Sequence, residues 1–149
     1  MFEYGAYWSG IDWEPYLIET EDGWLITVFR LLGRNGERPA ENADKKSIYV
    51  HHGGGGDASS WLFSWPTALM DAGYDVWLGN QRGNIFGNTN VNDGTWTLKE
   101  RWDWSHAEIA QIDLPAQIEK ILEVTGKEKV TMAAYSEGTF ITMYALASQ

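Results

Sequence analysis

The sequence predicts an α/β fold in which a mainly parallel sheet, covered by helices on both faces, follows an N-terminal hairpin. Three observations support this prediction. Short apolar runs alternate with longer segments of helical periodicity. The turn signal Glu21-Asp22-Gly23 separates the first two apolar runs. The apolar run at 130–133 leads directly into a serine flanked by small residues, and a further apolar segment follows it.

The individual elements are expected where apolar patterns lie between turn residues. Strands are predicted at 16–19, 24–31, 47–51, 74–78 and 129–133, and the first two form the hairpin. Helices are predicted at 60–72, 105–126 and 139–147. Pro115 is expected to divide the second helix, with Asp113 as the cap of its second part. Polar segments rich in Gly and Asn predict loops at 33–46 and 79–94.

Composition excludes several function classes. The 149 residues suffice for one domain with a real core, and the net charge is −10. Such a surface repels nucleic acid and anionic membranes, so neither is an expected partner. The absence of cysteine excludes disulfides, thiolate catalysis and Cys-zinc sites. The spacing of the acidic residues gives no case for a metal site.

Targeting signals are not evident in the sequence. The start, Met1-Phe2-Glu3-Tyr4-Gly5, lacks the basic residues and apolar run of a signal peptide. No stretch approaches the length of a membrane span. The compartment is therefore not indicated by these residues.

The segment Ala134-Tyr135-Ser136-Glu137-Gly138 has the pattern of a nucleophile elbow. In that turn a strained backbone projects a serine hydroxyl from the edge of an α/β sheet, and small residues relieve the crowding between strand and helix. Ser136 is therefore the candidate nucleophile of an ester hydrolase. An ordinary strand-to-helix turn remains the alternative.

A second candidate element is His52-Gly53-Gly54-Gly55-Gly56, which follows the strand at 47–51. In α/β-hydrolases, amides from this loop and from the residue after the nucleophile bind the oxyanion. The expected donors here are the amides of Gly54 and Glu137. A flexible surface loop is the alternative, and a phosphate cradle is disfavoured because no G-K-[ST] follows.

The residues resemble the acid lipase family of α/β-hydrolases, which includes lysosomal acid lipase, gastric lipase and sterol ester hydrolases. The resemblance rests on Thr20–Leu25, on the run Asp71–Asn80 (DAGYDVWLGN) and on Arg82-Gly83-Asn84. Asp113–Ala116 and Thr125-Gly126 also match, so the resemblance extends from about Trp13 to Ala147.

The resemblance implies the N-terminal part of an α/β-hydrolase fold and a cofactor-free serine hydrolase of triacylglycerols or sterol esters. It assigns the nucleophile to Ser136 and an oxyanion amide to Gly54. Members of this family are often lysosomal, secreted or lipid-associated.

Two departures from the family pattern concern the elbow and the glycine loop. The family elbow is usually G-H-S-Q-G, whereas this chain has Ala134, Tyr135 and Glu137 at the differing positions. The Glu137 carboxylate is expected to disfavour a developing negative charge unless it points away or is protonated. The run of glycines in the loop is expected to loosen it.

The rest of a catalytic triad is missing from this chain. In this fold the order is Ser, then acid, then His, but His51, His52 and His106 all precede Ser136. One of the first two is expected to shape the oxyanion loop, and His106 is expected at the surface or in packing. We therefore expect residues 1–149 to form a single partial domain that lacks the final strands, the lid, the acid and the base.

This incompleteness leads to three hypotheses. The first is a lipid ester hydrolase whose remaining half lies elsewhere, so that the isolated chain is inactive or nearly so. A C-terminal half or a second chain then covers the open edge of the elbow strand. The second is a non-catalytic structural or assembly subunit, and the third is an acyltransferase on the same scaffold.

Overall fold

The computed structural model describes residues 1–37 and 45–148. Its strands are β1 (Ile11–Glu19), β2 (Trp24–Arg34), β3 (Ser47–His51), β4 (Asp75–Leu78), β5 (Thr89–Asn90) and β6 (Thr131–Ala134). Its helical elements are α1 (Phe2–Ser9), η1 (Ala58–Trp61), α2 (Trp65–Asp71), α3 (Leu98–Arg101), α4 (His106–Glu108), η2 (Ile109–Asp113), α5 (Leu114–Thr125) and α6 (Glu137–Ala147). None of the helices in these residues combines the length and the hydropathy of a membrane span.

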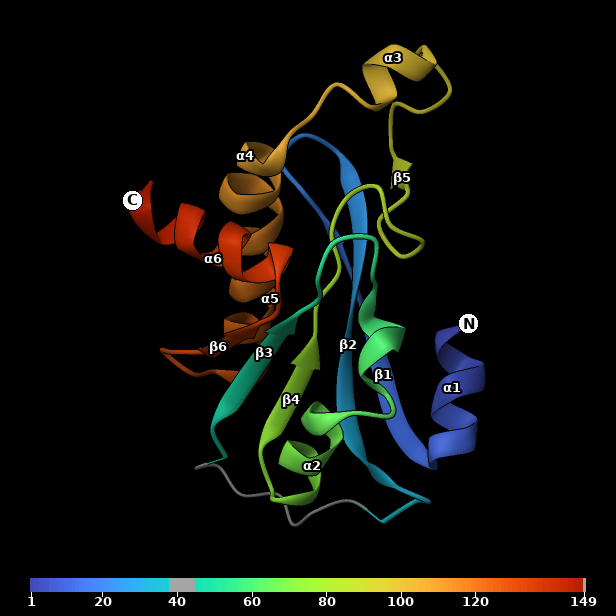
Figure 1. Cartoon of the computed structure of the whole chain (residues 1–149), viewed down its shortest axis with the longest axis vertical. Coiled ribbons are helices and arrows are strands. Elements are labelled where there is room, and N and C mark those ends of the chain that lie inside the picture. Colours follow the sequence, from blue (N-terminus) through green and yellow to red (C-terminus); the bar gives the residue numbers. More distant parts are fainter. Residues whose placement is uncertain (38–44, 149) are drawn as a thin grey trace.

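The six strands form one mixed sheet with the order β1-β2-β4-β3-β6, and β5 pairs with β2 (Figure 1). β3 pairs in parallel with β4 and with β6. β2 pairs antiparallel with β1, β4 and β5. The predicted α/β fold and the hairpin are confirmed, but the sheet is mixed rather than mainly parallel. The difference arises because the hairpin joins the parallel part through an antiparallel pairing of β2 with β4.

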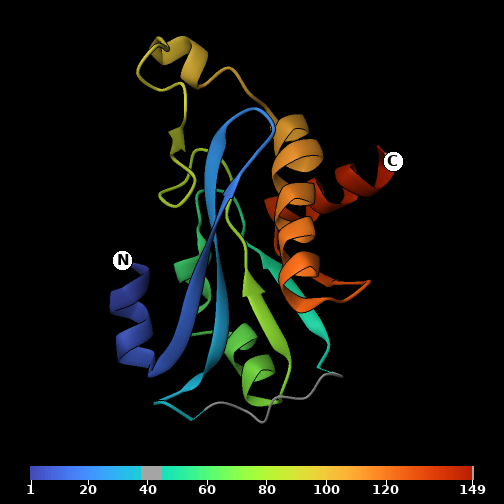
Figure 2. The same ribbon diagram turned by 180° about the vertical axis from the view of Figure 1, so that it is seen from behind.

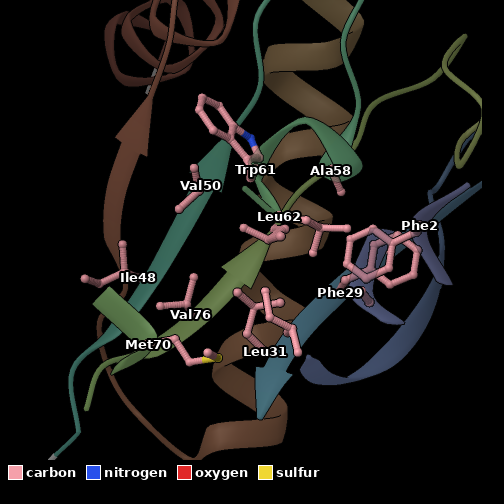
Figure 3. Close-up of a cluster of buried hydrophobic side chains, with 13 residues drawn as sticks. Phe2, Phe29, Leu31, Ile48, Val50, Ala58, Trp61, Leu62, Met70 and Val76 are labelled. Carbon is pink, nitrogen blue, oxygen red and sulfur yellow. The ribbon is translucent and has the colours of Figure 1, made fainter. Parts of the chain in front are cut away.

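Helices cover both faces of the sheet, as predicted. Seen from opposite sides, α2 lies in front of the sheet in Figure 1 and α5 lies in front of it in Figure 2. On the α2 face, α1 and η1 complete a cluster in which the rings of Phe2 and Phe29 stack at 3.8 Å (Figure 3). On the other face, residues of η2, α5 and α6 such as Ile109, Ile121 and Ile141 pack on Tyr49 and Trp77. All positions of β3 and β4 are buried, and their successive side chains point to opposite faces, so these strands contribute to a core on each face.

The predicted helix at 105–126 is present as α4, η2 and α5 in direct succession. Pro115 does not interrupt it, because the π-helical turn η2 precedes the proline and Pro115 lies at the start of α5. The prediction that Asp113 caps the second part is wrong. Its backbone is helical and its side chain makes no capping bond. Instead, the carboxylate accepts hydrogen bonds from Arg82.

Some elements were not predicted from the sequence. β1 begins five residues earlier than expected, because Pro15 is tolerated on an edge strand. α1, α3 and β5 are short and carry weak patterns. Of the predicted loop at 33–46, residues 33 and 34 belong to β2, and 38–44 lie outside the described residues.

Candidate active site

Ser136 lies in the sharp turn between β6 and α6. Its φ of 51° and ψ of −119° are unusual, and only Asn35 shares a positive φ among the described non-glycine residues. A serine in this region carries strain of about 1–3 kcal/mol. The helix holds it there, because the carbonyl of Ser136 accepts a hydrogen bond from the amide of Thr139 at 3.0 Å. The Ser136 residue itself is exposed.

The strain predicts a difference between two substitutions at this position. Ser136→Gly is expected to raise the free energy of unfolding by about 1 kcal/mol relative to Ser136→Ala, because glycine adopts a positive φ without a Cβ penalty. Both variants lack the hydroxyl, so the comparison isolates the backbone. Urea unfolding of the two variants measures the difference, and equal midpoints would show that the turn is unstrained.

The glycine loop touches the elbow directly. A Cβ placed on Gly53 would lie 3.1 Å from the Cβ of Ser136. A Cβ placed on Gly138 would lie only 2.5 Å from the carbonyl oxygen of His52. The approach at Gly138 leaves no room for a side chain, and the approach at Gly53 is tight, where the end of β3 meets the start of α6. The two sequence motifs therefore meet at one edge of the sheet.

Two backbone amides are available at this junction. Glu137 is the first residue of α6, so its amide has no acceptor within the helix. The carbonyl of Gly53 accepts hydrogen bonds from the amide of Gly56 at 3.0 Å and from Nδ1 of His52 at 2.8 Å. Because the Gly53–Gly54 peptide is trans, its N–H points opposite to that carbonyl. The orientation of the Gly54 amide is thus fixed by bonds to the other side of the same peptide.

The side-chain amide of Asn84 assigns the tautomer of His52. Nδ2 of Asn84 donates to Nε2 of His52 at 3.0 Å and to Oδ1 of Asn80 at 3.0 Å. Nε2 is therefore the acceptor, and Nδ1 carries the proton that is donated to Gly53. Burial lowers the pKa of His52, which favours this neutral form.

His51 lies beneath the loop and is fully buried. Its Nδ1 is 2.8 Å from the hydroxyl of Tyr49, and its Nε2 is 3.0 Å from Oε1 of Gln81. Burial, with a smaller contribution from His52, lowers the pKa of His51 to about 4. Both ring nitrogens are hydrogen-bonded, so this histidine has a structural role beneath the loop.

Sequence reasoning missed the contact between His106 and Glu137. Nε2 of His106 lies 2.6 Å from Oε1 of Glu137, and the side chain of His106 is half exposed. The residues are 31 positions apart, on α4 and α6. No sequence spacing signals such a pair, because it depends on how the two helices pack.

A cleft of about 650 Å³ opens beside the elbow and the glycine loop. It is lined by Gly55, Gly56, Asp57, Gln81, Arg82, Gly83, Asn84, Ile85, Trp104, Ser105, His106 and Glu137. The size is within the range of small-molecule sites. Among the described residues, no group of three His, Asp or Glu side chains is arranged to hold a metal ion.

Family models match both parts of the chain. Residues 46–149 match the model of the alpha/beta hydrolase fold. The chain belongs to the alpha/beta hydrolase fold family. Residues 2–65 match the model described as the partial alpha/beta-hydrolase lipase region. The two matches together extend over the hairpin, the glycine loop and the elbow of this hydrolase-fold chain.

Curated relatives support the resemblance to acid lipases. The chain is 38% identical to gastric triacylglycerol lipase of Mus musculus, over 96% of this chain and 37% of that protein. It is 36% identical to lysosomal acid lipase/cholesteryl ester hydrolase of Homo sapiens, over 95% of this chain and 36% of that protein. The expected resemblance is confirmed, and the chain spans a little more than a third of the length of these relatives.

Solved structures agree on the fold. An esterase of Pyrococcus furiosus superposes with a TM-score of 0.61 at 14% identity, covering 95% of this chain and 49% of that one. An epoxide hydrolase of Vigna radiata superposes with a TM-score of 0.57 at 19% identity, covering 92% and 35%. At these identities the similarity concerns the fold alone.

Proposed function

We propose that this chain supplies the nucleophile and the oxyanion site of a serine hydrolase of lipid esters, with triacylglycerols or sterol esters as substrates. The observation that carries the proposal is the strained Ser136 turn placed against the Gly53–Gly54 loop. The substrate class follows from the acid lipase relatives, whose names include triacylglycerol lipase and cholesteryl ester hydrolase.

In the proposed reaction, Oγ of Ser136 attacks the ester carbonyl while a base takes its proton. The carbonyl oxygen becomes an oxyanion that accepts hydrogen bonds from the amides of Gly54 and Glu137. Collapse breaks the carbon–oxygen bond to the alcohol, which leaves with the proton. Water then hydrolyses the acyl-enzyme and regenerates the serine.

The base of this reaction is proposed to come from outside these residues. Both ring nitrogens of His51 and of His52 are already hydrogen-bonded, and His106 contacts Glu137. A C-terminal part of the same protein or a second chain would supply the acid and the histidine. It would also cover the outer edge of β6 and the apolar groove that Ile118, Val130 and Met132 form beside it.

A fluorophosphonate probe tests the proposal because it phosphonylates only an activated serine. Ser136 is expected to be labelled in the assembly that contains the acid and the histidine. The isolated chain is expected to react at least about a thousand-fold more slowly, because the base is missing. Peptide mapping by mass spectrometry locates the label, and Ser136→Ala is the control. An assembly that leaves Ser136 unlabelled rules the proposal out.

A non-catalytic assembly subunit is the second candidate. The observation that favours it is the Glu137 carboxylate, whose Oε2 would lie 3.2 Å from a Cβ on Gly54, beside a proposed donor amide. Purification of the chain with its natural partners separates the two candidates. A stable complex in which no serine esterase activity is found supports the assembly role.

A further inference from the structure

The Glu137 carboxylate is an electrostatic obstacle at the proposed oxyanion site. The same residue supplies one donor amide, and its carboxylate lies against Gly54, which supplies the other. The side chain is only 25% exposed, so water screens it incompletely. An uncompensated negative charge here would oppose the charge that forms on the carbonyl oxygen.

His106 is held against this carboxylate. It is the first residue of α4, where Ser105 and Glu108 form a capping box that fixes the start of the helix. Its Nε2 contacts Oε1 of Glu137 at 2.6 Å. Its ring also packs edge-on against the ring of Phe140, one turn further along α6, with a centroid distance of 5.4 Å. Two contacts to one face of α6 therefore orient the imidazole.

The other charged groups of the cleft do not replace His106. Arg82 lines the cleft, but its guanidinium is bound to Asp113 and Asp22. Asp57 also lines the cleft and adds negative charge. In the described part of the chain, His106 is thus the cleft residue whose side chain contacts the Glu137 carboxylate.

We propose that His106 is a positioning residue that binds the Glu137 carboxylate and keeps its negative charge from opposing the oxyanion at Ser136. This inference rests on the proposed function and adds a residue to it. It explains how an elbow with glutamate after the serine keeps a usable oxyanion site. His106 does not touch the reacting atoms and acts only through Glu137.

A double-mutant cycle of labelling rates tests this role in the assembly that contains the acid and the histidine. His106→Ala is expected to slow phosphonylation of Ser136 about ten-fold, which corresponds to about 1.4 kcal/mol. Glu137→Gln is expected to speed it a few-fold, since the opposing charge is gone. In the Glu137→Gln background, His106→Ala is expected to change the rate less than about two-fold.

Two matched variants complete the cycle. His106→Lys places a permanent cation beside Glu137 and is expected to keep more than about half of the rate, as compensation requires. Glu128→Gln removes an exposed charge on the segment between α5 and β6 and is expected to leave the rate of His106→Ala unimproved. A merely structural role of His106 would not be rescued by neutralising Glu137.

The outcomes separate this inference from the proposed function. If the parent protein is labelled and His106→Ala has the same effect in both backgrounds, or no effect, the role of His106 is overturned. The proposed function then still stands. Failure of the parent protein to label at Ser136 removes both. Rescue by Glu137→Gln but not by Glu128→Gln supports the inference.

Discussion

Replacing Asp113 by alanine is expected to lower the free energy of unfolding by about 3–5 kcal/mol. Asp113 is completely buried and Arg82 is 1% exposed. The carboxylate accepts hydrogen bonds from Nε, Nη2 and the backbone amide of Arg82 at 2.9, 2.6 and 2.9 Å. Removing it leaves a buried guanidinium with only Asp22 as an ionic partner and an unpaired amide. Urea unfolding of the chain measures the loss.

An exposed ion pair provides the matched control. Arg34 and Asp71 form a two-bond pair whose side chains are 36% and 46% exposed. Asp71→Ala is expected to cost less than about 1 kcal/mol, because water replaces the carboxylate there. Equal losses for the two variants would contradict the view that burial makes the Arg82 pair critical.

A second variant distinguishes the stability lost when the buried pair is broken from the net contribution of the pair to the free energy of unfolding. Burial raises the pKa of Asp113 above its usual value, although Arg82 opposes this effect. At the carboxylate, burial therefore outweighs the stabilisation that Arg82 provides. The double variant Arg82→Met/Asp113→Leu is expected to lose less stability than Asp113→Ala alone. A larger loss in the double variant would show that the pair is strongly stabilising.

The Arg82 pair also matters for the site. Gln81 and Asn84 flank Arg82 and bind His51 and His52, respectively. Arg82 fixes this segment to the hairpin turn through Asp22 and to the helix through Asp113. We therefore expect Asp113→Ala to loosen the glycine loop as well as to destabilise the fold.

The stability of the chain is expected to fall by about 3 kcal/mol as the pH decreases from about 6.5 to about 4. The cause is His51, whose pKa burial lowers to about 4 in the folded state. In the unfolded chain a histidine takes up a proton near pH 6.5. Between these values the unfolded state binds more protons than the folded state, so acid favours unfolding. His52 adds a smaller effect of the same sign, since burial lowers its pKa too.

Unfolding free energies measured at several pH values from 7.5 to about 4.5 test this dependence. His51→Gln removes the titrating group and is expected to flatten the pH dependence, whatever its effect on stability at pH 7.5. His106→Gln changes a half-exposed histidine and is expected to retain most of the dependence. A profile for the unmodified chain that is flat across this range would contradict the burial of a neutral His51.

The sequence predictions were more accurate where a feature depends on neighbouring residues than where it depends on contacts between distant parts of the chain. Both ends of β3 were predicted correctly, because its five residues lie between segments that signal turns. The π-helical turn before Pro115 was not foreseen, since a proline alone does not reveal whether a helix ends or adjusts its hydrogen bonds. The antiparallel pairing of β2 with β4 was also missed, because it depends on how the hairpin joins the parallel strands.

The sequence by itself determined the fold class, the hairpin and the places of the glycine loop and the serine turn. These features depend on apolar periodicity and on turn and glycine motifs, and both can be recognised within short stretches of contiguous residues. Only the tertiary structure decided that Asp113 binds Arg82 and that His106 binds Glu137. Each of these pairs joins residues 31 positions apart, and their contact depends on how whole elements pack.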